Sequence, residues 1–248
     1  MINYDRIASE YCQHRKVHPG VLAQLIERSA IGKNSKVLEV GCGTGNYAVA
    51  LRTQIGCSVS AIDPSEEMLH RAKERSAEVD FTIGTAEKLD FSSCSFDLIF
   101  SVDVIHHLTS LVDFFKESFR VLLDGGMICT VTDLEWIIRH RKPLASYFPE
   151  TVETELKRYP KIDQLKRIMT KVGFVDIEEH MVEFSYELHD TQAYRDKAFS
   201  SLHLISKKAF ELGIGRMERD LRSGPIRCVS RYSLLWGTKP SYVNMSAQ

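Results

Sequence analysis

The stretch from residue 37 to residue 46 constrains the fold more than any other part of the chain. An apolar run leads directly into three glycines, Gly41, Gly43 and Gly45. A helix-forming segment follows, and the next apolar run ends at Asp63. This order predicts a strand–loop–helix–strand unit that approaches a nucleotide-like ligand with bare backbone and holds a ribose with a carboxylate.

The spacing of the glycines distinguishes between ligands. A dinucleotide site needs G-x-G-x-x-G, whose last small residue packs the helix against the strand. Here that position holds Asn46, and Glu39 stands two residues before the first glycine. A carboxylate at Glu39 would repel a pyrophosphate, but it suits a ligand with an ammonium and a sulfonium, as in S-adenosylmethionine. The pattern E-x-G-x-G-x-G, with an acid about 20 residues later, resembles the first two motifs of the class I S-adenosylmethionine-dependent methyltransferases.

Four further segments resemble the same family, and together with the first they cover residues 1–135. They are the loop at 84–89, the fourth motif at 96–108, the helix and turn at 119–126, and an entry helix with Tyr4, Asp5, Ala8, Tyr11 and Arg15. The entry helix is similar to that of the small-molecule branch, which includes the quinone-biosynthesis and arsenite methyltransferases. The cysteines do not match the arsenite pattern, and Ser101-Val102-Asp103-Val104 replaces the motif of the DNA and RNA amino-methyltransferases.

The resemblance implies roles for the cofactor-binding residues. Glu39 would orient the methionine ammonium, Asp63 would accept from both ribose hydroxyls, and Glu87 would read the adenine edge. The full expected set is Tyr11, Arg15, Glu39, Gly41, Cys42, Gly43, Gly45, Asp63, Pro64, Met68, Ala86, Glu87, Val102 and Asp103. Asp103 has an alternative role, which is to support its own loop.

His106 and His107 are the candidate catalytic residues. They follow the fourth expected strand, at the carboxyl edge of the sheet where ligands bind in open α/β folds. One of them could act as a general base or as a hydrogen-bond partner of the substrate. The alternative is that both cap the next helix or stabilise the loop. No metal site is expected, because the six cysteines are scattered and none forms a C-x-x-C pair.

Strand and helix patterns alternate five times, which predicts an α/β fold. We expect a doubly wound, mostly parallel, seven-stranded Rossmann-like methyltransferase sheet with helical cap insertions. The expected strands are 36–40, 58–63, 80–84, 96–102, 127–132, 174–187 and 228–238, and the clearest helices are 46–55, 112–123 and 161–172. A single methyltransferase domain is expected over 1–248, with N-terminal cap helices at 1–30, a cofactor-binding core at 36–133 and cap insertions at 134–160 and 191–222.

The charge distribution and the composition limit the classes of substrate and partner that the chain could bind. Residues 1–135 hold 13 Lys and Arg against 19 Asp and Glu, and the remainder holds 19 against 14. The basic second half fits an anionic substrate, although such an excess is also ordinary solvated surface, and it is too dilute for nucleic-acid binding. No apolar run is long enough to span a bilayer and no secretion signal is visible, so a cytoplasmic location is expected.

The sequence therefore predicts an S-adenosylmethionine-dependent methyltransferase. It would transfer the methyl group to a small molecule by direct in-line displacement and release S-adenosylhomocysteine. The sequence does not distinguish between O, N, S and C as the accepting atom. One alternative is a non-catalytic protein that binds or senses S-adenosylmethionine. Another is a nicotinamide-dependent oxidoreductase, which the glycine spacing disfavours, and a third is methylation of a protein or RNA.

Overall fold

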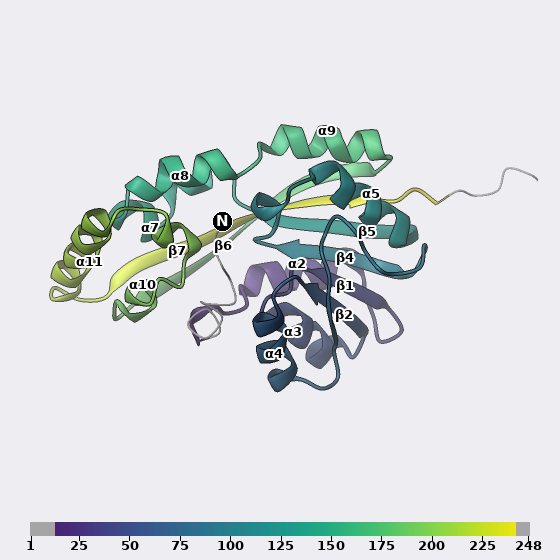
Figure 1. The fold of residues 1–248 in the computed structure, drawn as a ribbon, viewed down its shortest axis with the longest axis horizontal. Coiled ribbons are helices and arrows are strands. Elements are labelled where there is room, and N and C mark those ends of the chain that lie inside the picture. The colour runs from purple at the N-terminus through teal and green to yellow at the C-terminus, as the bar shows by residue number, and fades with distance from the viewer. Residues whose placement is uncertain (1–12, 242–248) are drawn as a thin grey trace, which may run out of the picture.

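The computed structural model describes residues 13–241 and has a seven-stranded sheet with helices on both faces (Figure 1). The strand order is β3-β2-β1-β4-β5-β7-β6. The first five strands pair in parallel, and β7 pairs antiparallel with both of its neighbours, β5 and β6. The strands are β1 (Lys36–Val40), β2 (Ser58–Asp63), β3 (Asp80–Ile83), β4 (Phe96–Val102), β5 (Leu122–Thr132), β6 (Val175–Leu188) and β7 (Ile226–Thr238). The predicted α/β, mostly parallel sheet is confirmed.

The core helices begin and end where local chemistry favours it. They are α2 (Pro19–Ser29), α3 (Asn46–Ile55), α4 (Glu66–Arg75), α5 (Leu111–Val121) and α9 (Ile162–Val172). The Ser65 hydroxyl accepts from the Met68 N–H and so caps α4, as its sequence predicts. Gly56 and Gly173 end α3 and α9 in the left-handed conformation that glycine adopts at little cost. Within the described residues, no helix is long and apolar enough to cross a membrane.

Both faces of the sheet are buried, which fixes its register. Val37 and Leu38 are neighbours on β1, yet they belong to two hydrophobic clusters on opposite faces. Leu98 and Ile99 on β4 divide in the same way, and all four side chains are fully buried. A slip of one residue would exchange the two faces, so the carboxyl ends of β1 and β4 are held in fixed relation.

One boundary differs from the sequence-based prediction. The helix expected at 112–123 ends at Val121, and β5 begins at Leu122 rather than at residue 127. Leu122 is fully buried and pairs with Phe96. Burial of its side chain and strand pairing of its backbone therefore both favour its place in the sheet. The following turn lies inside the strand as an irregularity, where the Gly125 N–H donates to the Lys239 carbonyl at 2.8 Å.

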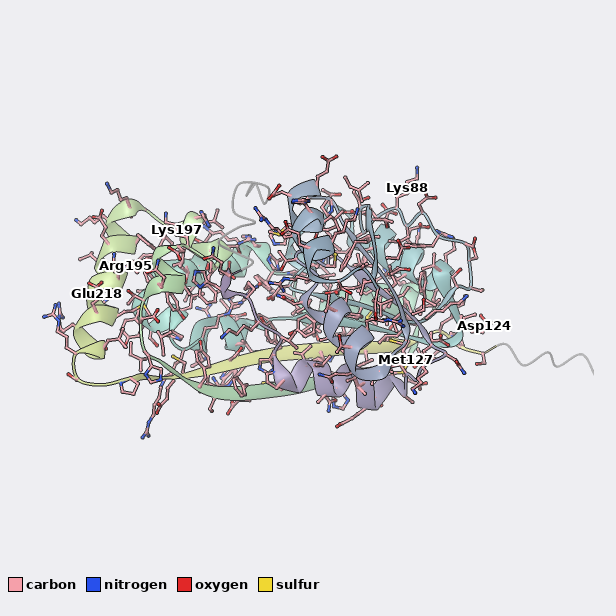
Figure 2. All side chains as sticks on the ribbon, turned by 90° about the horizontal axis from the view of Figure 1, so that it is seen from below. Lys88, Asp124, Met127, Arg195, Lys197 and Glu218 are labelled. Carbon is pink, nitrogen blue, oxygen red and sulfur yellow. The ribbon has the colours of Figure 1, made fainter. Side chains whose placement is uncertain are left out.

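A helical cap is built on the far ends of β6 and β7. These strands pair from Val175 with Thr238 to Leu188 with Ile226, well beyond the core sheet (Figure 1). The cap helices are α6 (Glu135–His140), α7 (Leu144–Tyr147), α8 (Glu150–Arg158), α10 (Gln192–Arg195), the 3₁₀ helix η3 (Ser200–His203) and α11 (Lys207–Leu221). They fall within the two segments expected as insertions. Figure 2 shows Arg195 and Glu218 at the cap end, and Lys88 and Asp124 at the opposite end.

The cap has its own hydrophobic cluster, distinct from the two of the core sheet. Phe148, Tyr194 and Met217 lie at its centre and are almost fully buried. Phe148 and Tyr194 stack with ring centroids 5.9 Å apart. Helix α11 approaches this stack closely because Gly213 faces it without a side chain: a Cβ there would lie 2.2 Å from the Phe148 ring.

Two glycines on α11 provide a matched test of this packing. Alanine normally stabilises a helix interior by about 1 kcal/mol relative to glycine. We expect Gly215→Ala to be neutral or stabilising, since nothing lies within 4 Å of its added Cβ. Gly213→Ala should instead destabilise the protein by about 1–3 kcal/mol, because Phe148 must move. Urea unfolding of both variants would measure the difference, and shifts in the same direction would contradict the packing described.

Candidate functional site

The loop after β1 requires its glycines. Gly41, Gly43 and Gly45 have φ values of 72°, 52° and 75°, in the left-handed region that other residues rarely adopt. A Cβ on Gly41 would lie 2.4 Å from Val104 Cγ2, and one on Gly45 would lie 2.7 Å from the Phe81 ring. The loop therefore exposes backbone at the carboxyl edge of the sheet, where side chains would not fit.

Asp63 anchors this loop to the end of β2. Its Oδ2 accepts from the Gly43 N–H at 2.8 Å, and its Oδ1 accepts from the Ser65 N–H at 2.9 Å. The side chain is largely buried. Each carboxylate oxygen can accept more than one hydrogen bond, so this anchoring leaves Asp63 able to accept from a ligand as well.

Glu39 is a buried carboxyl group beside the loop. Its Oε2 accepts from the Ala48 N–H at 2.8 Å, and only 2% of the residue is exposed. Burial raises the pKa of Glu39 from 4.5 to about 8, and the nearby charge of Asp63 adds to the rise, whereas the Ala48 N–H opposes it. A cationic ligand group placed here would favour the ionised carboxylate.

A small cavity of about 60 Å³ opens between the glycine loop and the start of α3, and we call it the loop cavity. Its lining residues are Arg15, Lys16, Glu39, Gly41, Cys42, Gly43, Thr44, Asn46, Tyr47, Val102, Asp103 and Tyr232. The Thr44 Oγ1 is buried and has no hydrogen-bond partner among the described residues. An unsatisfied buried hydroxyl is costly, so this atom marks a place where a polar ligand would be stabilised.

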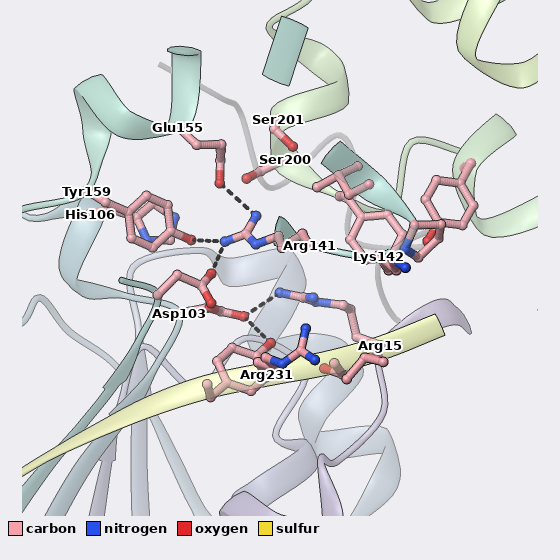
Figure 3. A pocket seen from close by; sticks show the side chains of 18 of the residues that line it. Arg15, Asp103, His106, Arg141, Lys142, Glu155, Tyr159, Ser200, Ser201 and Arg231 are labelled. Atoms are coloured by element: carbon pink, nitrogen blue, oxygen red, sulfur yellow. Dashed lines mark hydrogen bonds and ion pairs between the residues drawn. The ribbon is translucent and has the colours of Figure 1, made fainter. Parts of the chain in front are cut away.

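A second cavity of about 130 Å³ lies between the core and the cap, and we call it the cap cavity (Figure 3). Its wall combines aromatic and charged side chains from the segment that follows β4, the cap segments and the two long strands. These include His106, His107, Asp133, Arg141, Lys142, Glu155, Tyr159, Tyr186, Tyr194, Phe199, Ser200, Ser201 and Arg231.

Arg15, Asp103 and Tyr232 line both cavities and form the wall between them. The Asp103 Oδ2 accepts from Arg15 Nη2 at 2.8 Å and from the Tyr232 hydroxyl at 2.8 Å (Figure 3). Burial first, and then the charge of Asp103, raise the pKa of Tyr232 well above 10, so its hydroxyl remains a neutral donor. Asp103 holds this position with φ of 59°, an uncommon conformation for a residue with a side chain.

Both histidines face the cap cavity as neutral rings. His106 stacks on Tyr159 at 4.1 Å, and its Nδ1 is buried with no hydrogen-bond partner among the described residues. Burial lowers the pKa of His106 well below 6.5, and nearby positive groups lower it further. Burial and then Arg158 lower the pKa of His107 to about 4, against the opposing charge of Asp103.

The structure brings together only part of the expected cofactor set. Arg15, Glu39, Gly41, Cys42, Gly43, Val102 and Asp103 line the loop cavity. Gly45 caps α3 and Asp63 holds the loop, whereas Pro64, Met68, Ala86 and Glu87 do not line this cavity. Glu87 Oε1 accepts from the N–H and hydroxyl of Thr109 at 2.8 and 3.0 Å. The position of Tyr11 lies outside the described residues.

Sequence reasoning missed several residues of these walls. Thr44 stands inside the glycine motif, so its place in the sequence could have suggested it. Lys16 and Tyr47 flank segments that were expected to approach the ligand. Tyr232 has no local signal that links it to Asp103 in particular, because β7 brings the two together across 129 residues of chain.

Comparisons with known proteins agree with this geometry. Residues 38–130 match a family model described as a methyltransferase domain. A demethylmenaquinone methyltransferase of Staphylococcus aureus (strain JH9) is 27% identical over 199 residues, which cover 70% of this chain and 81% of that protein. The structure of a protein from an antibiotic biosynthesis pathway of Anabaena variabilis ATCC 29413 has a TM-score of 0.70 at 24% identity, covering 90% of this chain and 98% of that one.

A second solved structure is that of phosphoethanolamine N-methyltransferase 2 of Haemonchus contortus, with phosphomonomethylethanolamine and S-adenosylhomocysteine bound. It has a TM-score of 0.61 at 22% identity, covering 96% of this chain and 58% of that one. These similarities support a class I S-adenosylmethionine-dependent methyltransferase that acts on small molecules, built on a Rossmann-like fold. The predicted family, fold, enzyme class, cofactor and general reaction are thus confirmed, and the sensor and oxidoreductase alternatives are not favoured.

The raised pKa of Glu39 gives a testable pH dependence of stability. Between pH 4.5 and about 8 the folded protein keeps a proton that the unfolded chain releases, so the free energy of unfolding falls as pH rises. The Glu39→Gln variant has no ionisable group at this position, so its free energy of unfolding does not fall for this reason. We expect it to be more stable than the wild type at pH 8 by on the order of 1–3 kcal/mol, with the difference shrinking toward pH 5. Urea unfolding at several pH values measures this.

The exposed Glu27 on α2 supplies the control for that comparison. Glu27→Gln should change the free energy of unfolding by a small amount that does not depend on pH in this range. A Glu39→Gln effect that is equally flat with pH would contradict a buried carboxyl group with a raised pKa.

Proposed function

We propose that this methyltransferase binds S-adenosylmethionine in the loop cavity and transfers the methyl group across the Asp103 wall to a small acceptor in the cap cavity. The observation that carries the proposal is that the two cavities share Arg15, Asp103 and Tyr232. A methyl group must pass in line from sulfur to acceptor, so the two ligands must meet at a common boundary.

The residues of the loop cavity fit the cofactor. Glu39, which lines this cavity, is proposed to orient the ammonium. Asp63, which holds Gly43 of the same loop, is proposed to accept from the ribose hydroxyls. The orphaned Thr44 hydroxyl supports a polar ligand at the same place. The bound cofactor supplies a methyl group already activated by its sulfonium, so the protein has to orient the reactants and exclude water.

The other proposed contacts lie around these groups. Cys42, Val102 and Asp103 are proposed beside the methionine part, with Arg15 and Tyr11 closing over it. Pro64, Met68, Ala86 and Glu87 are proposed beside the adenosine. For Glu87, this contact with the adenine amine would add to or replace its bond to Thr109.

His106 and His107 are proposed as the catalytic residues of the acceptor site. Their lowered pKa values keep both rings neutral near pH 7, so each ring has an unprotonated nitrogen that can accept a hydrogen bond from the methyl-accepting substrate. The same low pKa values make them weak proton acceptors. Hydrogen bonding and orientation of the acceptor are therefore the role that the geometry supports better than removal of a strongly held proton.

Three finer points belong to the same proposal. The acceptor is proposed to be anionic, which the basic second half of the chain supports. A cytoplasmic location is supported by the five described cysteines, all of which are free. The whole chain is proposed to be one methyltransferase domain with cap insertions, since the long strands β6 and β7 belong to both the core sheet and the cap.

The cofactor assignment is tested at Asp63. Asp63→Asn should weaken binding of S-adenosylhomocysteine by about tenfold or more, because a hydrogen bond to a charged acceptor is worth about 1.5–3 kcal/mol. Isothermal calorimetry measures the affinity, with the exposed Asp80→Asn as a control expected to match the wild type. Equal affinity in the two variants would remove Asp63 from the cofactor site.

The acceptor assignment is tested at the histidines. His106→Asn and His107→Asn should leave S-adenosylhomocysteine affinity within about twofold, because neither residue lines the loop cavity. Turnover, measured as S-adenosylhomocysteine release against a panel of small phenols, amines and phosphorylated amines, should fall by about 10²-fold in at least one. The exposed His70→Asn is the control. Full turnover in both variants would exclude the histidines from catalysis.

A further inference from the structure

The charges that line the cap cavity are unevenly compensated. Each of its three carboxylates already pairs with arginine: Asp103 with Arg15, Asp133 with Arg141, and Glu155 with Arg141 and Arg158. Lys142 also lines the cavity, and it has no ion-pair partner within the described part of the chain. Its positive charge is therefore not balanced by a neighbouring carboxylate.

Arg231 adds a second cation whose counter-ion lies outside the cavity. Its Nε donates to Glu183 Oε2 at 2.6 Å, but Glu183 does not line the cavity and its side chain is 53% exposed. The side chain of Arg231 is itself only 19% exposed. Water screens the exposed carboxylate more than the sheltered guanidinium, so a net positive potential remains on the cavity side.

The histidines report the same potential. Arg158, Arg141 and Arg15 all lower the pKa of His106 in addition to burial, and Arg158 lowers that of His107. Since both rings are neutral, they add no positive charge of their own. The direction of these pKa shifts agrees with an excess of positive charge around the inner wall of the cavity.

The positions of these cations give the site a direction. Lys142 and Arg231 line the cap cavity but not the loop cavity, whereas Asp103 borders both. Figure 3 shows Asp103 and Lys142 on opposite sides of the pocket in that view. An acceptor with a negative group at Lys142 would therefore present its other end to Asp103, where the methyl group enters.

We propose that Lys142 and Arg231 form an oxyanion subsite in the cap cavity, which selects small acceptors that carry a phosphate or carboxylate group remote from the methylated atom. This inference rests on the proposed function, because it names the acceptor class of the same site.

The test uses inorganic phosphate and acetate as probes, titrated by calorimetry into the protein with and without S-adenosylhomocysteine at low salt. We expect saturable binding of at least one probe, and tighter binding of phosphate would point to phosphorylated acceptors rather than carboxylates. Lys142→Ala and Arg231→Gln should each weaken it by about tenfold or more, as loss of a charge-assisted hydrogen bond implies. Lys142→Arg should retain it.

Lys207→Ala is the matched control, because Lys207 is 90% exposed on α11 and far from the cavity wall. It should bind both probes as the wild type does. Lys142 is itself an exposed residue, so its replacement should not alter the fold, which circular dichroism would verify. A bound anion should also raise the pKa of His107 from about 4, which proton NMR of the imidazole can follow.

The outcomes separate this inference from the function on which it rests. Binding of S-adenosylhomocysteine without saturable binding of either probe would overturn the oxyanion subsite and leave the proposed function standing. Probe binding that is unchanged in both Lys142→Ala and Arg231→Gln would also overturn the subsite. Failure to bind S-adenosylhomocysteine would overturn the proposed function and, with it, the acceptor class.

Discussion

The antiparallel pairing of β6 with β7 is the interaction on which the two-cavity site depends. Twelve residue pairs join the strands, from the edge of the core sheet to the base of the cap. The C-terminal half of β7 pairs with β5 and carries the fully buried Trp236, while Arg231 and Tyr232, in the middle of the strand, line the cavities. Without this continuous ladder the cap helices would have no fixed position relative to the glycine loop.

Asp103 is where the two halves of the molecule meet. It follows β4 directly, and it receives hydrogen bonds from Arg15, near the N-terminal side of the described chain, and from Tyr232 on β7. Three distant segments thus converge on one carboxylate. A half-buried carboxylate with charged and neutral donors is strongly held, so the boundary between the cavities is well defined before any ligand binds. This pre-organisation is what an in-line transfer requires.

The sequence predicted the core well because its signals are local. The glycine loop, the Ser65 cap and the apolar strands each depend on a few adjacent residues, and all of them are present in the structure. The start of β5 was predicted too late because Asp124, Gly125 and Gly126 are typical of a turn, whereas Leu122 before that turn already pairs with Phe96 of β4.

The acceptor side could not be predicted in the same way. Tyr159 stacks on His106 from a cap helix, and Lys142, Arg231 and Tyr232 reach one cavity from separate segments. No local pattern relates these residues, since only the long strands and the cap place them together. The change of pattern after Asp133 identified the cap segments as insertions, but the sequence alone could not separate side chains that face the cavity from those of the core or the surface.

A crystal structure of the protein with S-adenosylhomocysteine bound would test the central claim most directly. We expect the adenosyl and methionine parts in the loop cavity, with the thioether sulfur directed past Asp103 toward the cap cavity and His106 beyond it. A ligand that binds elsewhere, or whose sulfur faces away from the cap cavity, would contradict the claim that Arg15, Asp103 and Tyr232 form the boundary across which the methyl group passes.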